Sequence, residues 1–179
     1  MLTSYYGGGG PAPAVTLTPT SLTFASQVVG TTSAAQTSTL KNTGTAALTI
    51  TSVGLAGANP GDFTQSNDCP ASLAANATCT ITVTFSPTAA GGRAGSVTIA
   101  DDAPGSPHAL TLSGSGSTPA PAVTLTPTSL AFGPLRVGTA SAPQSSTLKN
   151  TGTASLTIAG IALTGANAGD FGQTNDCPS

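Results

Sequence analysis

Charged residues are scarce in this chain, and glutamate and tryptophan are missing from it altogether. Only 6% of the 179 residues are charged and the formal net charge is -2. The four basic residues are scattered along the chain: Lys41, Arg93, Arg136 and Lys149. Binding to nucleic-acid phosphates or to an anionic membrane surface depends on clustered lysine and arginine. We therefore expect neither nucleic acid nor a charged lipid surface as a partner.

Long apolar runs are missing as well. No stretch of about 18 consecutive apolar residues occurs, so we expect no transmembrane segment in this sequence. Residues 1–10 carry neither a charged beginning nor an apolar run and do not read as a signal peptide. Either the information for export lies upstream of this sequence, or the protein is not exported.

Few side chains of the kind that carry catalysis or stacking are present. His108 is the single histidine, it follows Ser106-Pro107, and no G-x-S-x-G nucleophile motif occurs. We interpret it as a surface or strand-edge residue. Tyr5 and Tyr6 lie in the N-terminal tail, so no exposed aromatic ring is predicted on a folded face for stacking against sugars. We expect no enzymatic activity, no catalytic residues and no cofactor.

One pair of carboxylates leaves two interpretations open. Asp101-Asp102 could bind calcium, or the pair could cap the strand that ends at Ala100 and open the turn at residues 103–105. Asp commonly stabilises the backbone of such turns, and we prefer the second interpretation. We expect no metal site.

What the chain does contain is threonine, serine, glycine and short apolar runs. The hydrophobic fraction is 38%, which is too high for a disordered chain. Threonine and apolar residues alternate in residues 80–85 (T-I-T-V-T-F), and Val97 and Ile99 share one face of a second run. This period of two is typical of a half-buried strand. Candidate strands cover residues 15–18, 21–24, 36–41, 47–55, 62–65, 79–85, 95–100 and 108–112. They predict an all-β, immunoglobulin-like β-sandwich of about seven strands.

The sequence also repeats itself. The segment PAPAVTLTPTSL that begins at Pro11 returns at Pro119, and GDF at Gly61 returns at Gly169, always 108 positions later. Of the 61 aligned positions, 43 are identical. A constant offset of this size indicates tandem domains.

This repeat gives four predicted regions. Residues 1–13 form a flexible N-terminal linker, residues 14–113 one complete sandwich, residues 114–121 a Gly/Ser/Pro linker, and residues 122–179 a truncated second sandwich. We interpret the chain as a piece of a longer array. We expect the second copy, without its later strands, to be mobile or to pair with another chain through strand edges.

A series of motifs resembles a known family. They are N-x-G at Asn42, G-D-F at Gly61, C-T-I-x-V-x-F-x-P at Cys79, G-S-V-T-I-x-D-D-A at Gly95 and L-x-L-S-G-S-G at Leu110. Together they resemble the bacterial "choice-of-anchor D" repeats and the ASH (abnormal spindle–Hydin) immunoglobulin-like domains. The resemblance implies a repeated, non-enzymatic sandwich module. Bacterial members look like parts of exported or surface-anchored proteins, and eukaryotic relatives are associated with cilia and centrosomes.

The three cysteines follow the repeat. Cys177 is the repeat equivalent of Cys69, and the equivalent of Cys79 falls past the last residue. We expect a disulfide between Cys69 and Cys79, and an unpaired Cys177 able to cross-link two chains. A disulfide would place the protein in an oxidising compartment. Two free thiols in a cytosolic protein, or a zinc site that includes His108, are the alternatives.

Two functions agree with these observations. The first is a structural spacer module of an exported or cell-surface bacterial protein, which could support adhesion and whose neighbours are other repeats or protein partners. The second is an intracellular protein-binding scaffold of the Hydin or ciliary type, located in the cytoplasm or cilium. The ligand is not named by any motif.

Overall fold

The computed structural model describes residues 10–178, which fall into two compact units, one up to Thr118 (unit 1) and one from Pro119 (unit 2). Over the described residues every regular element is a strand apart from two short 3-10 turns, so the all-β prediction is confirmed. In that same part of the chain, no helix has the length and apolar character needed to span a bilayer. The predicted tail at residues 1–13 lies mostly outside the described residues, since residues 1–9 are not among them.

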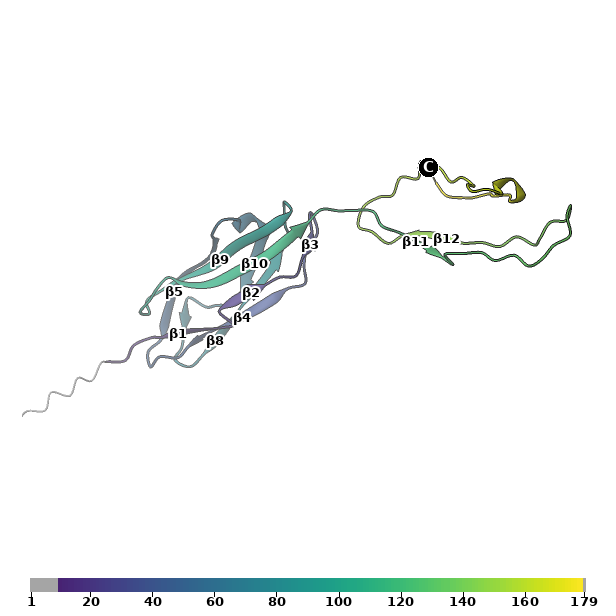
Figure 1. The fold of residues 1–179 in the computed structure, drawn as a ribbon. Helices are drawn as coiled ribbons and strands as arrows, with labels where there is room; N and C mark the ends of the chain where they lie inside the picture. The colour runs from purple at the N-terminus through teal and green to yellow at the C-terminus, as the bar shows by residue number, and fades with distance from the viewer. Residues whose placement is uncertain (1–9, 179) are drawn as a thin grey trace, which may run out of the picture. The chain divides into compact units, whose positions relative to one another are not determined.

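Unit 1 is built from two sheets that lie face to face (Figure 1). Its strands are β1 (Val15–Thr18), β2 (Ser21–Thr23), β3 (Gln27–Val28), β4 (Gln36–Asn42), β5 (Leu48–Ala56), β6 (Phe63–Asn67), β7 (Ser72–Leu73), β8 (Thr78–Phe85), β9 (Gly91–Asp101) and β10 (His108–Ser117). One sheet has the order β1-β4-β8-β6. The other has the order β2-β10-β9-β5-β7, with β3 added beside β10. All pairings are antiparallel except those of β10 with β2 and β3, which are parallel.

The core lies between these sheets, where the alternation in the sequence places it. In β8 the side chains of Ile81, Val83 and Phe85 are fully buried, whereas the threonines between them are only half-buried. The rings of Phe24, Phe63 and Phe85 pack together, with centroids 5.1–6.1 Å apart. Aromatic clustering of this kind supplies a large buried area in a core that has no tryptophan.

A buried asparagine connects the segment ahead of β1 to the turn after β4 and to β7. Asn42, at the end of β4, is 0% exposed, and its amide makes four hydrogen bonds. Its Nδ2 donates to the carbonyls of Ala46 and Leu73, and its Oδ1 accepts the N–H groups of Gly44 and Ala14. A side chain at position 44 would place its Cβ 2.3 Å from the Ala12 oxygen. The N-x-G motif is therefore a turn that satisfies a buried polar group completely.

The predicted linker at residues 114–121 is wrong in its first half. β10 continues to Ser117, and its last residues pair with the beginning of β9, as in Gly114↔Arg93 and Gly116↔Gly91. A Cβ at Gly114 would lie 2.6 Å from the Phe85 ring, and a Cβ at Gly116 would lie 2.1 Å from the Ala89 oxygen. These glycines allow close packing rather than flexibility. Gly91 and Gly92 are likewise part of β9, although the candidate strand began only at residue 95.

The number of strands also differs from the expectation of about seven. Unit 1 has ten, because β3 and β7 are two-residue strands that come in addition to the eight candidate ranges. Two residues cannot show a periodicity, so sequence alternation could not reveal β3 or β7.

Unit 2 contains one pair of strands, β11 (Val123–Thr126) and β12 (Thr147–Asn150). Their register, with Val123 opposite Asn150, reproduces the register of β1 and β4, with Val15 opposite Asn42. A short 3-10 turn, η2 (Ala168–Asp170), stands where unit 1 has η1 (Pro60–Asp62). The repeat in the sequence is thus matched by a repeat in local structure.

Candidate functional site

The cysteines of unit 1 join the two last strands of the four-stranded sheet. Cys69 follows β6, Cys79 lies in β8, and the two form a disulfide with Cα atoms 4.9 Å apart. Hydrogen bonds reinforce the link: Asp68 N–H donates to the Thr80 carbonyl, Thr80 N–H donates to the Asp68 carboxylate, and Cys69 N–H donates to Asn67 Oδ1. The edge strand β6 is therefore covalently tied to its neighbour β8 at one end.

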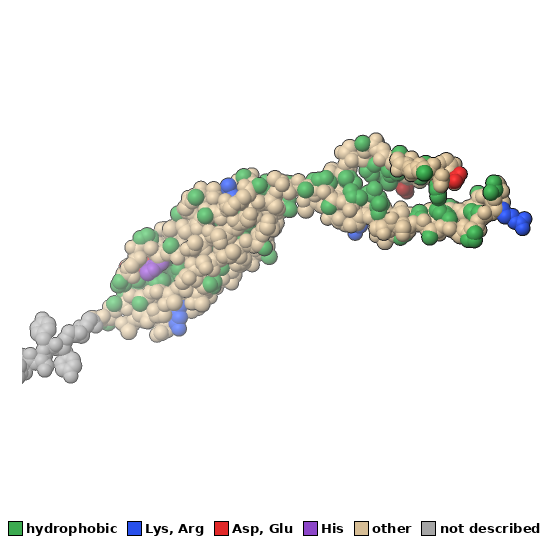
Figure 2. Space-filling view, viewed as in Figure 1, with side chains coloured by type: hydrophobic (Ala, Val, Ile, Leu, Met, Phe, Trp, Pro, Cys, Tyr) green, Lys and Arg blue, Asp and Glu red, His purple; other side chains and the backbone are tan. Residues whose placement is uncertain are grey.

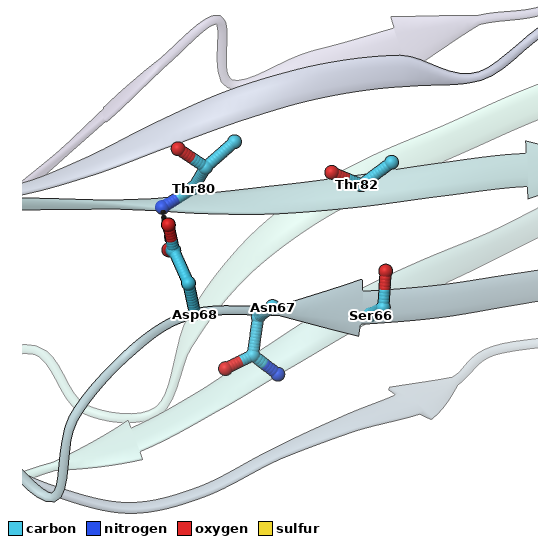
Figure 3. Close-up of a pocket in the computed structure, with 5 residues that line it drawn as sticks. All are labelled: Ser66, Asn67, Asp68, Thr80 and Thr82. Atoms are coloured by element: carbon cyan, nitrogen blue, oxygen red, sulfur yellow. Dashed lines mark hydrogen bonds between the residues drawn. The ribbon is translucent and has the colours of Figure 1, made fainter.

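A shallow polar hollow lies beside this disulfide. It is lined by Ser66, Asn67, Asp68, Thr80 and Thr82 (Figure 3). Figure 3 shows the Asp68 carboxylate turned toward the backbone nitrogen of Thr80, with the hydroxyls of Ser66 and Thr82 further along the strands. Asp68 is the ionisable member of this lining, and its carboxylate is already engaged by the Thr80 N–H. The groups of this hollow that could bind a ligand are hydroxyls and one amide, which form hydrogen bonds.

The same corner contains the one group of potential metal ligands found over the described residues. A carboxylate oxygen of Asp68 and the sulfurs of Cys69 and Cys79 lie within 4.8 Å of one another. The two sulfurs, however, are bonded to each other, and a metal-binding cysteine must be a thiolate. His108, the third ligand of the zinc alternative, is not in this group.

An ion pair that sequence reasoning missed lies at the opposite end of β6. Asp62, in the G-D-F motif, is 2% exposed, and its carboxylate accepts hydrogen bonds from Arg93 Nε and from the N–H and hydroxyl of Thr88. Burial alone would raise the pKa of Asp62, but the hydrogen bonds from Arg93 and Thr88 and the Arg93 charge outweigh it, so the pKa lies below its ordinary value. Asp62 thereby ties η1 to the beginning of β9.

Asp101 and Asp102 each bind backbone, as the strand-capping interpretation requires. Asp101 Oδ1 accepts the Ala103 N–H at 2.9 Å, and Asp102 Oδ1 accepts the Thr49 N–H at 2.8 Å. Hydrogen bonds from Thr49 hold the pKa of Asp102 below its ordinary value. His108 is half-buried at the first position of β10, with Nε2 at 3.6 Å from Asp101 Oδ1.

Cys177 has no disulfide partner. Its N–H donates to Asn175 Oδ1 at 3.3 Å, in the same turn that holds Cys69 through Asn67 at 3.1 Å. The two cysteines therefore share one local geometry, and they differ in whether a second sulfur is within reach.

The outer surface of unit 1 is uncharged over most of its area. Figure 2 shows isolated basic side chains and one histidine on a face that is otherwise polar or apolar. Threonines point outward from neighbouring strands, as where Thr39 stands opposite Thr80 and Thr37 opposite Thr82.

Comparison with known proteins identifies a family. The sequence of residues 13–109 matches the family described as ASH, abnormal spindle-like microcephaly-associated, ASPM-SPD-2-Hydin. The matched range begins ahead of β1 and ends at the beginning of β10. Among curated proteins, none matches the sequence.

Solved structures show similarity at low sequence identity. A protein of unknown function from Porphyromonas gingivalis W83 is 14% identical, with a TM-score of 0.46 over 59% of this chain and 46% of that one. The ASH/PapD-like domain 7 of human CEP192 is 22% identical, with a TM-score of 0.43 over 66% and 97%. The secreted serine protease VesC from Vibrio cholerae is 14% identical, with a TM-score of 0.40 over 56% and 22%. This chain thus spans less than half of the length of the first protein and about a fifth of VesC.

Proposed function

The chain belongs to the ASH family, and from this premise we propose that it is a non-catalytic spacer module of an exported or cell-surface bacterial protein. In this proposal unit 1 is one complete module and residues 119–178 belong to a second copy of it. Neighbouring repeats or protein partners are its contacts, and it could hold an adhesive domain away from the cell. No cofactor takes part.

The disulfide between Cys69 and Cys79 carries this proposal. Disulfides persist in secreted and surface proteins and are rare in the reducing cytosol. The cross-link closes a short loop in a core without tryptophan, and a loop of this length contributes about 2–3 kcal/mol of stability in the chain-entropy estimate. A module of about 100 residues has little stability to spare, so this contribution is a substantial part of the total.

The path of the chain through unit 1 supports a spacer role. Figure 1 shows the chain entering unit 1 at one end of the sandwich, ahead of β1, and leaving it at the other end, after β10. Modules with this property add length when they are joined in series. The parallel pairing of β10 with β2 and β3 connects the last strand of the module to its first ones.

Peptide mapping of the protein taken from its native source tests the proposal. Free thiols are first blocked with iodoacetamide in the folded state, so that no disulfide exchange occurs during digestion. We expect a linked pair of peptides containing Cys69 and Cys79 in the unreduced digest, and its loss from a parallel digest treated with reductant. Two alkylated cysteines at these positions would overturn export as the setting, and the intracellular scaffold of the Hydin type would then be favoured.

A further inference from the structure

The outer face of the four-stranded sheet of unit 1 is lined almost completely by threonine, and we call it the threonine face. Inward and outward residues alternate in β1, β4 and β8. Every outward residue of these three strands is threonine except Lys41, and β6 adds Thr64 and Ser66. Figure 3 shows the side chains of Ser66, Thr80 and Thr82 on one side of β6 and β8. The face therefore presents hydroxyl and methyl groups and a single charge.

The register of the strands arranges these threonines in rows. Thr18 stands opposite Thr39, and Thr39 stands opposite Thr80. In the next row, Thr37 stands opposite Thr82. Neighbouring strands lie about 4.7–4.9 Å apart, and alternate residues of one strand lie about 6.6 Å apart. The threonine face is thus a regular grid with one hydroxyl and one methyl group at each point.

The hydroxyls of this face are not used within the protein. Over residues 10–178, none of them forms a hydrogen bond with another protein group. On the other sheet, in contrast, Thr98 Oγ1 donates to the Gly54 carbonyl and Thr51 Oγ1 donates to the Ala100 carbonyl. A hydroxyl can both donate and accept a hydrogen bond, so the threonine face has its full hydrogen-bonding capacity available to an external partner.

The second copy keeps the part of the grid that β1 and β4 form. Each threonine of this face in β1 and β4 has a threonine or serine as its repeat equivalent. In unit 2, Thr126 stands opposite Thr147, which is the register of β1 and β4. On the other sheet, Thr51 has Ala159 as its equivalent. The hydroxyls of the threonine face are therefore retained where those of the opposite face are not.

Few kinds of partner suit this grid. A charged ligand would find only Lys41 on it. Stacking of sugars or bases requires aromatic rings, and the outward residues of these strands include none. Threonine and serine are also under-represented among the residues that dominate protein–protein binding. The partner should instead offer many hydrogen-bonding groups in a regular array.

The surface of ice is such an array. Water molecules hydrogen-bond at about 2.7–2.8 Å, so two molecules bonded tetrahedrally to the same third one lie about 4.5 Å apart. The spacing of about 4.7–4.9 Å between strands is close to this value, whereas the repeat along a strand corresponds less closely. Neighbouring strands are turned by roughly 20–25° relative to each other. The match is therefore best over the central pair of strands, β4 and β8.

We propose that the threonine face binds ice. Its hydroxyls take the places of water molecules in the outermost layer of the crystal, and its methyl groups lie between them. Repeated modules would bind more strongly than one, because several faces on one chain engage the same crystal. The inference goes beyond the spacer function and does not depend on it.

Partition of the full chain between ice and liquid tests this binding. Ice is grown slowly on a cooled probe in a dilute solution of the protein, and the protein concentration is then measured in the melted ice and in the remaining liquid. A growing crystal rejects solutes that do not bind to it. We expect the chain to be several-fold enriched in the ice fraction relative to a non-binding protein of similar size.

A pair of lysine variants locates the binding face. Thr39→Lys with Thr147→Lys places one bulky charge on the grid of each copy, and we expect it to remove most of the enrichment. Thr111→Lys with Thr157→Lys is the matched control. It adds the same charge at exposed residues, Thr111 on the other sheet and Thr157 as the equivalent of Thr49 in β5. This control should partition like the parent.

Urea unfolding establishes that both variants fold. If the lysine at residue 39 destabilises unit 1, Thr39→Gln with Thr147→Gln replaces it, because glutamine also covers the grid but adds no charge. The same loss of enrichment is expected from that variant.

Four results would overturn the proposal. The first is rejection of the parent from ice to the same extent as the non-binding protein. The second is equal enrichment of the parent and of the folded variant at residues 39 and 147. The third is an equal loss in the control variant. The fourth is a dimer of the chain, seen by sedimentation, that the change at residue 39 disrupts, since a second copy would then cover this face. None of these concerns the native pairing of Cys69 with Cys79, so the spacer function is tested separately.

Discussion

Asp62 is the buried charged side chain among the described residues of unit 1. Its carboxylate is 2% exposed and has three donors, from Arg93 and Thr88. Arg93 itself is partly exposed, with 19% of its side chain accessible. Removing one partner of such a pair leaves a buried donor or charge unpaired. The free-energy cost of that unpaired group is larger than the net stabilisation that the intact pair provides.

We predict that Asp62→Asn lowers the free energy of unfolding of unit 1 by about 2–4 kcal/mol. The amide cannot neutralise Arg93, and its NH2 group meets donors rather than acceptors. Urea unfolding followed by circular dichroism measures the change. Asp170→Asn is the matched control, since Asp170 is the repeat equivalent of Asp62 but is exposed in unit 2. Equal unfolding midpoints for the two variants would contradict this role of Asp62.

The same carboxylate predicts an acid dependence of stability. The pKa values of Asp62 and Asp102 are both lowered in the folded chain. A carboxyl group with a lowered pKa stabilises the fold at any pH above its pKa in the unfolded chain, which is about 3.9. This stabilisation is lost as the pH falls through the pKa of the group in the folded chain. We expect the urea midpoint of unit 1 to stay level from neutral pH to about pH 5 and to decline below about pH 4. The decline should be smaller in Asp62→Asn, and an identical decline in both proteins would exclude Asp62 as its source.

The ends of the strands differ more between the sequence-based prediction and the structure than their centres do. The alternation in residues 79–85 predicts β8 to within one residue, because each apolar side chain there is buried and each threonine is not. β9 and β10 were expected at residues 95–100 and 108–112, but they extend over Gly91–Asp101 and His108–Ser117. Glycine carries no side chain to alternate, so G-S-G-S was interpreted as a linker. Only the neighbouring Phe85 ring and Ala89 carbonyl show why glycine is required there.

The sequence predicted the cysteines of the candidate site but not its ion pair. The relation of Cys69 and Cys177 could be read from the repeat, because the repeat is a property of the sequence itself. The pairing of Asp62 with Arg93 could not, since the two are 31 positions apart and belong to different local motifs. The one signal in the sequence was that unit 1 contains few charges and a single arginine, Arg93, which would need a carboxylate partner.

At the scale of the strand, Gly116→Ala should destabilise unit 1. The new Cβ would approach the Ala89 backbone oxygen to 2.1 Å, and a backbone atom cannot move aside without shifting the turn after β8. We expect a loss of about 1–3 kcal/mol, the range found for overpacking. Gly92→Ala is the control in the adjacent strand, because a Cβ there meets no atom within 4 Å. If both variants unfold at the same urea concentration as the parent, the close approach of β10 to this turn is not tight.

At the scale of the whole module, the arrangement of the first and last strands bears on a spacer under tension. The chain enters unit 1 at one end and leaves at the other (Figure 1), while β2 and β10 run parallel side by side. Pulling on the two ends draws these strands along their axes in opposite directions. Their hydrogen bonds are therefore loaded together in shear rather than opened one after another, which favours unfolding in a single step.

The disulfide then sets how far the module extends after that step. Cys69 and Cys79 are separated by 10 positions, and this loop stays closed while the rest of unit 1 is drawn out. A stretched chain gains about 3.3–3.6 Å per residue, so the oxidised module should extend by roughly 30 Å less than the reduced one. Single-molecule force spectroscopy with and without reductant measures this difference. A variant with Cys69→Ser and Cys79→Ser should extend to the reduced length in both conditions. An oxidised parent that already reaches that length would show that no disulfide closes the loop between Cys69 and Cys79. The stabilisation of about 2–3 kcal/mol assigned to that disulfide would then be absent.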